Sequence, residues 1–423
     1  MSVAEQNLTS RITYTDLYRR WEQSNWSAMD LDFSADRQGW EDLTEIQRKS
    51  ALWIYSMFFY GEDSVADNLS PYIDAAPKEE QKYFLATQQV DEARHAVFFH
   101  RFFSEVIGAG EDIATTLAFT EPQLGWGYRK VFDRLDRMAG ELRRDRSLPR
   151  FAQAITLYHL IVEASMAQPG QHFIEDYFVR AGTMPGFSAG MEHVSRDEQR
   201  HIGFGVKVLS ELLAESDECK AAVDELLAEV LPWLSSVFIP PNWDREYTRC
   251  YGFELEEIAA WGFKAVEMKW KAIGYPMQEM PPGVAPIDFD ADPLDRAADV
   301  IRMAQAGVIG EPGQDPDPSP EIQALYFDSV SRAVDPGVVN GHGPFTVQWR
   351  FADAAPWHLV VAGDSTHAEA GEATGADVTV EASWRDFIEI SKGAYPAPLA
   401  LLQRRLRLRG GPRDLLRLAR MFG

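Results

Sequence analysis

Apolar residues in the first two thirds of the chain recur at intervals of three and four positions, the spacing of helices that bury one face. No segment before residue 275 alternates between apolar and polar positions as a half-buried strand would. We expect helices over Tyr14–Trp26, Leu43–Ile73, Lys78–Ile107, Gly127–Leu142, Leu148–Ala181, Ser188–Glu215, Cys219–Phe238 and Leu255–Ile273. The longest of these are long enough for a bundle, so residues 1–275 are predicted to form an all-α domain.

The pattern changes after residue 275. Nine prolines lie between residues 276 and 320, a density that breaks helices. We therefore expect a linker at 276–320, interrupted by a short helix around Leu294–Ala306.

Residues 321–423 mix strand and helix patterns and are predicted to form a smaller α+β domain. β-branched and aromatic residues indicate strands over Phe345–Ala352, Trp357–Ala362 and Ala376–Ala382. Arg405–Arg409 alternates as an edge strand would, and helices are expected over Trp384–Lys392, Ala397–Leu402 and Arg413–Phe422.

The composition is that of a soluble globular protein, with 45% hydrophobic and 25% charged residues among 423. No run of 18 apolar residues occurs, so we expect no stable membrane insertion. The segment Met1–Arg11 is polar and lacks the apolar core of a signal peptide. Cys219 and Cys250 are the only cysteines, which fits a reducing cytoplasm better than a disulfide framework.

The formal net charge of −24 argues against nucleic acid as a partner, because phosphate repels such a surface. The C-terminus is a local exception. Seven arginines stand there against the single acid Asp414, namely Arg404, Arg405, Arg407, Arg409, Arg413, Arg417 and Arg420. They form either a solvated face, which is the more common outcome, or a patch for a membrane or an anionic ligand.

The strongest chemical signal is a Glu-x-x-His step that occurs twice. Residues 91–95 read Asp-Glu-Ala-Arg-His, and residues 197–201 read Asp-Glu-Gln-Arg-His. Because three residues advance about 300° around a helix, the glutamate and the histidine of each step become neighbours on one face. One such step is common on solvated helices, but two are far more specific. A dinuclear carboxylate site also needs a glutamate from each of two further helices.

Glu62 and Glu163 are the candidates for these two glutamates. Every neighbour on the helical face of Glu62 is apolar or aromatic, whereas the adjacent Asp63 has polar neighbours. An unpaired charge on a buried face costs several kcal/mol, so Glu62 needs a partner. Glu163 lies near Leu160 and Met166. Taken alone, either glutamate could equally be a buried salt bridge or a hydrogen-bonded acid.

The predicted metal ligands are Glu62, Glu92, His95, Glu163, Glu198 and His201. Carboxylates mixed with imidazoles favour iron or manganese over magnesium and over structural zinc. Each ligand histidine should donate its other N–H to an acceptor, and Asp91 and Asp197 could each reach the histidine of the opposite helix if they do not face solvent. Arg94 and Arg200 are either ion-paired near the site or exposed.

At these residues the chain resembles the ferritin-like superfamily, and within it the ribonucleotide reductase small subunit and the ligand-binding oxidases related to that subunit. The order of the ligands matches, with 30 positions from Glu62 to Glu92 and 35 from Glu163 to Glu198. The opening Trp21-Glu22, Leu31-Asp32-Phe33 and Trp40 is also similar, and the resemblance covers about residues 10–275. It implies a ferritin-like bundle with two iron ions, or a manganese–iron pair.

The chain departs from the reductase subunit at one position and matches the ligand-binding oxidases at two more. Phe99 stands where the reductase subunit usually carries its radical tyrosine, and phenylalanine variants there use a manganese–iron pair. In the ligand-binding oxidases a tyrosine five positions before the third glutamate is linked to a valine, and Tyr158 and Val65 match these places. The resemblance therefore implies a redox role for Tyr158, or a role in contact with the metal ligands, with a core tyrosine as the alternative. For Val65 the alternative is a plain core valine.

Residues 321–423 resemble a sterol carrier protein type-two domain. The resemblance rests on the order of Phe345-Thr-Val-Gln-Trp349, Asp377-Val-Thr-Val-Glu381 with the helix after it, Gly393, and the late strand Arg405–Gly410. Such domains enclose an apolar tunnel, so it implies a lipid-like ligand; the alternative is a structural or dimerisation module. The predicted fold is thus an all-α ferritin-like helical bundle followed by a smaller α+β lipid-carrier-like domain.

The leading functional interpretation is a non-haem diiron, or manganese–iron, oxidase or oxygenase. It would use dioxygen and an unidentified electron donor to oxidise a hydrophobic, lipid-like or acyl substrate, by hydroxylation, desaturation or N-oxygenation. Proteins of this family often form dimers, so a homodimer is expected. One alternative is a radical-generating subunit of the ribonucleotide reductase type, against which Phe99 argues. The other is a non-enzymatic metal- or lipid-binding protein.

Overall fold

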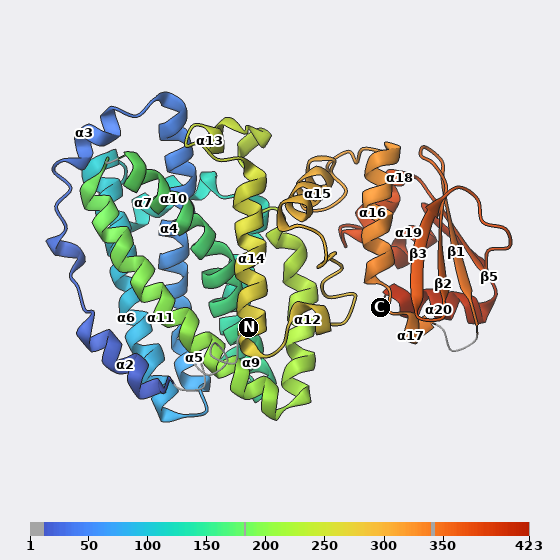
Figure 1. Ribbon diagram of the computed structural model, residues 1–423, viewed down its shortest axis with the longest axis horizontal. Coiled ribbons are helices and arrows are strands. Elements are labelled where there is room, and N and C mark those ends of the chain that lie inside the picture. The colour runs from blue at the N-terminus through green and yellow to red at the C-terminus, as the bar shows by residue number, and fades with distance from the viewer. Residues whose placement is uncertain (1–11, 182, 340–342, 423) are drawn as a thin grey trace. The chain divides into compact units, whose positions relative to one another are not determined.

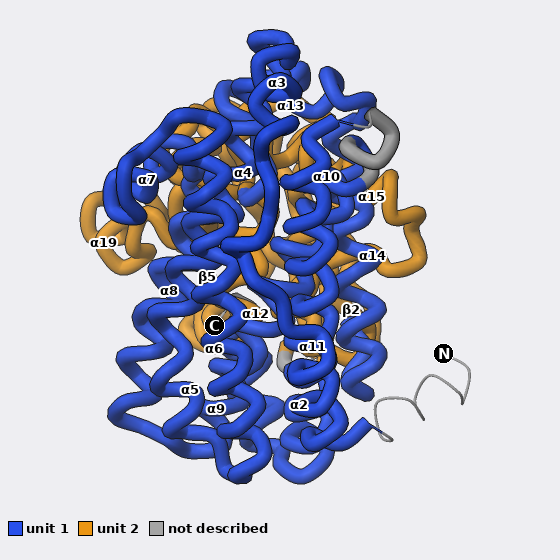
Figure 2. Tube along the Cα trace, turned by 90° about the vertical axis from the view of Figure 1, so that its left-hand side faces the viewer, with its two compact units in different colours: residues 1–226, 237–277 blue, residues 227–236, 278–423 orange. Residues whose placement is uncertain are grey.

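The computed structural model describes residues 12–181, 183–339 and 343–422 (Figure 1). Residues 1–11 and 423, which the predicted domain ranges include, lie outside the described residues. The chain forms two compact units, one from residues 1–226 and 237–277 and the other from residues 227–236 and 278–423 (Figure 2). Residues 278–320, expected to be a linker, therefore pack within the second unit.

The described part of the first unit is helical and contains no strand. Its α-helices are α2 (Tyr14–Gln23), α3 (Asp36–Glu41), α4 (Glu45–Asn68), α5 (Ser70–Ala75), α6 (Glu79–Phe102), α7 (Ile113–Thr120), α8 (Trp126–Leu142), α9 (Leu148–Ile155), α10 (Gln168–Ala181), α11 (Pro185–Glu215), α12 (Asp217–Leu234), which runs on into the second unit, α13 (Glu246–Arg249) and α14 (Leu255–Ile273). None of the described helices is apolar over a length that would cross a bilayer.

Four long segments of the first unit carry most of its buried polar side chains: α4, α6, α11 and a π-helical segment at Thr156–Ala167. α4 packs on α6, and α11 packs on both α6 and the π-helical segment (Figure 1). A reciprocal cap begins α4, since the Thr44 side chain accepts from the Gln47 amide and the Gln47 side chain accepts from Thr44. This cap agrees with the strong helical signal at the start of the segment.

The predicted helix Leu43–Ile73 is wrong at its C-terminal end. α4 ends at Asn68 and α5 begins at Ser70, followed by Pro71. Proline has no N–H to donate and its ring collides with the preceding turn, so α4 cannot continue through it. The periodicity of apolar residues runs on across this break because α5 buries the same kinds of residue.

The predicted helix Leu148–Ala181 has the observed ends but not the observed winding. α9 and α10 are separated by the π-helical segment, 12 residues in which Tyr158, His159 and Glu163 are all buried. A π-helix pairs residues five positions apart and is usually limited to one turn near functional sites. The interval of apolar residues is too coarse a signal to separate this winding from an α-helix.

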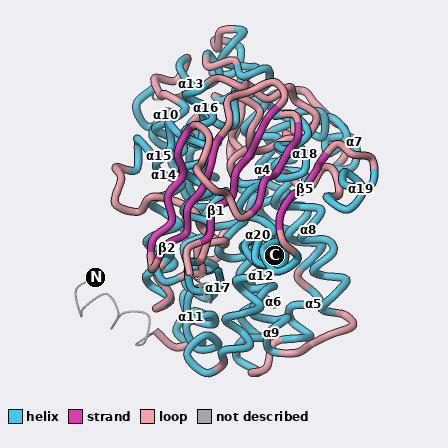
Figure 3. Tube along the Cα trace, turned by 90° about the vertical axis from the view of Figure 1, so that its right-hand side faces the viewer, coloured by secondary structure: helices cyan, strands magenta, loops and turns pink. Residues whose placement is uncertain are grey.

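The second unit contains a five-stranded sheet in the order β3-β2-β1-β4-β5 (Figure 3). The strands are β1 (Phe345–Phe351), β2 (Trp357–Ala362), β3 (Ser365–Ala370), β4 (Val378–Ala382) and β5 (Leu406–Gly410). β1 is parallel to β4, and the other neighbouring pairs are antiparallel. The helices are α15 (Pro293–Gln305), α16 (Pro320–Ala333), α17 (Pro336–Val339), α18 (Trp384–Ser391), α19 (Ala397–Leu402) and α20 (Pro412–Phe422).

Aromatic side chains fill the core between this sheet and its helices. Phe327 of α16 stacks on Trp357 of β2 with ring centroids 4.9 Å apart, and Trp349 and Trp384 close the cluster. The sequence did not predict α16, because its residues follow directly on the proline-rich stretch. It also missed β3, whose residues are mostly exposed at one edge of the sheet and carry no apolar alternation.

Candidate metal centre

Four elements of the first unit bring the six predicted ligands together. α4 carries Glu62, α6 carries Glu92 and His95, the π-helical segment carries Glu163, and α11 carries Glu198 and His201. All six side chains are buried. The Glu-x-x-His spacing has the effect expected from helical geometry, because each glutamate and its histidine face the same interior point.

The six side chains form two overlapping groups that could each hold a metal ion. One group is Glu62, Glu92, His95 and Glu198, and the other is Glu92, Glu163, Glu198 and His201. Within each group, the ligand atoms lie within 4.8 Å of one another. Glu92 and Glu198 belong to both groups, so these two carboxylates are placed to bridge a pair of ions.

Both histidines present the same ring nitrogen to the carboxylates. His95 Nδ1 lies 3.2 Å from Glu62 Oε2 and 3.3 Å from Glu92 Oε2. His201 Nδ1 lies 3.1 Å from Glu92 Oε1 and 3.5 Å from Glu163 Oε1. The opposite nitrogen of each ring, Nε2, points away from the carboxylates. This is the arrangement of a metal-ligating imidazole, in which one nitrogen binds and the other is hydrogen-bonded.

Several polar atoms of the centre have no hydrogen-bond partner among the described residues. They are Oε2 of Glu163, Oε2 of Glu198 and Nδ1 of His201, whose 3.1 Å approach to Glu92 Oε1 lacks hydrogen-bond geometry. A buried polar atom without a partner costs free energy, and native proteins rarely leave one in this state. All three atoms belong to predicted ligands, so a metal pair is the group that fits this donor set.

The pKa values of the four glutamates show that the centre is stabilised by positive charge. Burial raises the pKa of Glu62 to about 7 and that of Glu163 to about 8, and it raises the pKa of Glu198 as well. Burial also opposes the ionisation of Glu92, but His201 and the other histidine hold its pKa well below its ordinary value. Four carboxylates in so small a volume need compensating cations.

Asp91 fixes the orientation of His201 across the helix interface. Its Oδ2 accepts from His201 Nε2 at 3.1 Å, and Arg200 also donates to it. Its Oδ1 accepts from the Trp21 indole at 2.8 Å and from Arg94 at 3.0 Å. The sequence predicted that Asp91 could reach this histidine, but it had no signal for the indole, which lies 70 positions away.

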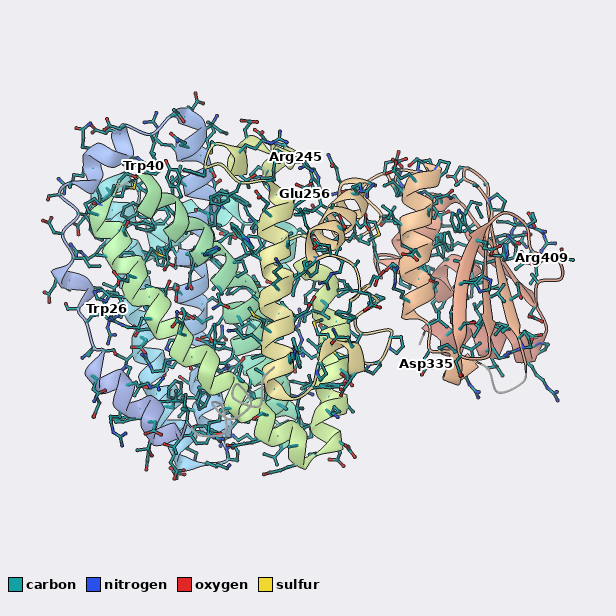
Figure 4. All side chains as sticks on the ribbon, viewed as in Figure 1. Trp26, Trp40, Arg245, Glu256, Asp335 and Arg409 are labelled. Atoms are coloured by element: carbon teal, nitrogen blue, oxygen red, sulfur yellow. The ribbon has the colours of Figure 1, made fainter. Side chains whose placement is uncertain are left out.

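Asp197 repeats the arrangement on the other side. His95 Nε2 lies 3.4 Å from its Oδ2, and the Trp26 indole donates to the same oxygen at 2.8 Å (Figure 4). Arg200 donates to its Oδ1 at 3.0 Å. Burial opposes ionisation, but the bond from His95 and the charge of Arg200 lower the pKa of Asp197 below its ordinary value. The structure buries Arg200 between the two aspartates, which decides between the ion-paired and exposed alternatives.

We expect Asp91→Asn to weaken metal binding roughly ten- to a hundredfold, because losing such an outer partner disturbs the orientation and basicity of His201. Competition with a chelator measures the change in affinity. The matched control is Asp67→Asn, an exposed acid on α4. Equal metal affinity in the two variants would mean that Asp91 does not orient the ligand.

Comparison with known families identifies the family to which the ligand-bearing part of the chain belongs. The family model described as "Ribonucleotide reductase, small chain" matches residues 10–232, which is more than half of the chain. The chain belongs to the ribonucleotide reductase small-chain family. All six predicted ligands fall inside the matched range.

Solved structures give the same fold for the ferritin-like helical part. An R2-like ligand-binding oxidase from Sulfolobus acidocaldarius is 24% identical, with a TM-score of 0.53 over 62% of this chain and 90% of that chain. Variants of an R2-like ligand-binding oxidase with anaerobically or aerobically reconstituted Mn/Fe cofactor are each 23% identical, with TM-scores of 0.54 over 62% of this chain and 93% of theirs. The second unit adds an α+β part beyond this match.

Phe99 occupies the place at which the small-chain family is expected to store a tyrosyl radical. It is fully buried and stacks on Phe58, with ring centroids 5.8 Å apart. The phenol at the centre is instead Tyr158, which donates a hydrogen bond to Glu92 Oε1 at 2.7 Å. Burial raises the pKa of Tyr158 well above its ordinary value, so it holds its proton against that carboxylate. A covalent link from Tyr158 to Val65 stays a prediction.

Sequence reasoning missed Gln88, which joins two of the glutamates. Its Nε2 donates to Glu163 Oε1 at 2.7 Å and lies 3.3 Å from Glu92 Oε1. Its Oε1 accepts from Nε2 of His159 at 3.0 Å. Burial lowers the pKa of His159 to about 3, so this ring is neutral. Gln88 stands four positions before Glu92 on the same helical face, a spacing from which it could have been found.

An apolar cavity of about 50 Å³ adjoins the carboxylates. Glu62, Glu92, Glu163 and Glu198 form its polar end. The remaining walls are apolar or aromatic and are formed by Ile54, Met57, Phe58, Gly61, Val65, Tyr128, Phe132, Val162, Met166, Ala167, Val237 and Phe238. The volume suits dioxygen or the end of an apolar group, but not a whole lipid.

Proposed function

We propose that the protein is a dinuclear metal oxidase that activates dioxygen at this centre and oxidises an apolar, lipid-like or acyl substrate. The observation that carries the proposal is the pair of overlapping ligand groups that share Glu92 and Glu198 and face an apolar cavity. The Mn/Fe cofactor named for the related oxidase structures supports a cofactor of two iron ions or of manganese with iron.

The side chains have distinct parts in this function. Glu62 with His95, and Glu163 with His201, would hold the two ends of a metal pair, and Glu92 and Glu198 would bridge it. Such a pair would supply the Lewis acidity and the electrons that the reduction of dioxygen needs.

Tyr158 and the cavity walls would then control the surroundings of the bound pair. The Tyr158 hydroxyl keeps a proton at Glu92 Oε1 and restrains that carboxylate. The apolar walls exclude water from the space beside the glutamates, which strengthens electrostatic interactions there.

An apolar substrate follows from the chemistry of the cavity walls. Only the terminal part of a chain fits beside the glutamates, so we propose that the reacting carbon enters end-on. The resemblance of residues 321–423 to a sterol carrier domain supports a lipid-like substrate, and mass spectrometry of material extracted from the purified protein tests it. A recovered fatty acid or isoprenoid supports this substrate class, and its absence from metal-loaded protein counts against it.

Metal analysis followed by optical spectra of the reduced protein mixed with oxygen tests the reaction itself. We expect about two ions per chain, of iron or of manganese with iron, and absorption that develops on exposure to oxygen. A fully loaded protein whose reduced form does not respond to oxygen would reject the oxidase.

We expect Gly61→Leu to separate metal binding from turnover. Gly61 lines the cavity, and a Cβ there would stand 2.9 Å from Tyr128 Oη and 3.4 Å from Phe132 Cζ. Tyr128 must therefore shift, and a leucine side chain would occupy part of the cavity that both residues line. Metal content should stay at the parent level, while oxidation of an apolar substrate falls at least tenfold. Gly140→Leu is the control, because a Cβ at Gly140 meets nothing within 4 Å. A fully active Gly61→Leu would place the substrate elsewhere.

The second candidate is a radical-generating reductase subunit, which family membership favours. Phe99 cannot form a phenoxyl radical, and this argues for the oxidase. Electron paramagnetic resonance after exposure to oxygen distinguishes the two functions. A persistent tyrosyl signal would favour the reductase subunit.

The partners complete the proposal. Turnover would need an external electron donor, and the chain would work as a homodimer in the cytoplasm. The two cysteines, Cys219 and Cys250, are both free, which supports a reducing compartment.

A further inference from the structure

The second unit has a short helix, α19, whose leucine side chains are exposed to solvent instead of packing against the rest of the protein. In α19, Ala400 is buried, but Leu399, Leu401 and Leu402 are 38%, 41% and 81% exposed. α19 lies beside β5 at one edge of the sheet (Figure 3). Single exposed leucines are common on protein surfaces, but three of the four residues from Leu399 to Leu402 are exposed leucines, which is an unusual concentration.

The leucines are held in place rather than carried on a loose loop. The turn after α19 is closed by backbone bonds from Gln403 to Leu399 at 2.9 Å and from Arg405 to Ala400 at 2.9 Å. The Arg405 guanidinium pairs with Asp386 and lies 4.4 Å from the Tyr395 ring centroid. A rigid turn loses little entropy when its apolar side chains are buried against a partner.

Arginines surround these leucines. Arg404 ends the turn, and Arg407 and Arg409 alternate with buried or half-buried leucines along β5, with Arg409 labelled in Figure 4. Arg404 and Arg407 are exposed and form no ion pair with any described residue. We call the set Leu399, Leu401, Leu402, Arg404, Arg407 and Arg409 the arginine–leucine patch.

A second helix that contacts β5 repeats the same combination. On α20, which also contacts β5, Leu416 is 63% exposed and stands between Arg413 and Arg420 at helical steps of three and four. From residue 397 to residue 422 the sequence holds seven arginines and one aspartate, a formal net charge of +6, whereas the whole chain carries −24. In the fold, Asp386 pairs with Arg405 and Glu381 with Arg409, so, of the residues that the structure describes, Arg404 and Arg407 carry the unpaired positive charge beside the leucines.

We propose that the arginine–leucine patch docks the second unit on the surface of an anionic lipid bilayer. Leucine side chains can enter the boundary between headgroups and acyl chains, while arginine guanidinium groups bind the lipid phosphates beside them. Basic residues near an anionic leaflet are attracted to its phosphates, and this attraction falls off within a Debye length of the surface. This surface goes beyond the proposed oxidase and does not depend on it.

The chemistry of the patch selects a bilayer over two other occupants. A second copy bound through the same patch would set arginine against arginine, since a two-fold interface is self-complementary. Nucleic acid would satisfy the arginines but would leave the three leucines without an apolar partner, and most of the chain would repel it.

Sedimentation of the full-length chain, loaded with metal, with lipid vesicles tests the proposal. We expect binding to vesicles containing about one third phosphatidylglycerol, little binding to pure phosphatidylcholine, and loss of binding in high salt. The variant Leu402→Ser/Arg404→Glu/Arg407→Glu should reduce binding at least tenfold. Circular dichroism confirms that the variant is folded.

A matched control lies in the first unit. Leu148 is 44% exposed, and Arg143 and Arg144 are exposed close to it. Leu148→Ser/Arg143→Glu/Arg144→Glu makes the same change in charge and removes one exposed leucine, so it should bind as the parent does. Equal loss in both variants, equal binding to neutral vesicles, or parent-like binding by the patch variant would overturn the proposal. So would a parent dimer, seen by sedimentation velocity, that only the patch variant disrupts without any binding to vesicles.

Discussion

Glu92→Gln is expected to abolish binding of both metal ions, because Glu92 is a member of both ligand groups. An amide cannot bridge two cations, and it offers only one neutral oxygen in place of two charged ones. His95 and His201 each lie within 3.3 Å of this carboxylate and would both lose its charge. Metal analysis after loading and desalting should give well under one ion per chain.

Glu163→Ala provides the graded comparison. Glu163 belongs to only one group, so its loss should release one ion and leave the other bound. Asp63→Asn is the control on α4, because Asp63 is only half-buried and belongs to neither group. If Glu163→Ala kept the parent stoichiometry, Glu163 would not be a ligand. If Glu92→Gln kept two ions, the bridging arrangement would be wrong.

Gly205→Ala is expected to destabilise the protein by about 3 kcal/mol, the upper part of the range for overpacked cores. A Cβ at Gly205 would stand 2.2 Å from Cβ and 2.7 Å from Cγ of His159. α11 and the π-helical segment touch at this point, so one of them must move. His159 supports Gln88, which in turn binds Glu163, so metal affinity should fall with stability. Chemical denaturation and chelator competition measure the two effects.

Gly203 gives a control two positions away on the same helix. A Cβ at Gly203 meets nothing within 4 Å, so Gly203→Ala should stabilise the protein by about 0.5–1 kcal/mol through the higher helical propensity of alanine. If both variants had the same stability, the close approach of α11 to His159 would not constrain the fold.

The candidate site was largely predictable because its charged side chains stand among apolar residues in the sequence. Glu62 could be found from its apolar neighbours, and the two Glu-x-x-His steps from their repetition. Trp21 and Trp26 could not, because each reaches its aspartate from 70 or more positions away and a tryptophan among apolar residues is usually a core residue. Only the folded chain brings such distant donors to one acceptor.

The fold was predictable where one periodicity persists over many residues. The range of α14, Leu255–Ile273, agrees with prediction, as does that of β2. Short elements such as α3 and α7 offer too few residues to define a period. Exposed strands such as β3 bury too little apolar surface to leave a pattern, so their pairing is decided by their neighbours in the sheet.

The π-helical winding of Thr156–Ala167 means that the number of residues in this segment determines which side chains face the metal centre. Tyr158 and Glu163 are five positions apart, and both reach the same centre. On an α-helix that interval turns through about 500°, which would set the two side chains roughly 140° apart around the axis. A π-helix pairs residues five apart, so it stacks them. A relative one residue shorter here could aim its phenol or its third glutamate at the ions, but not both.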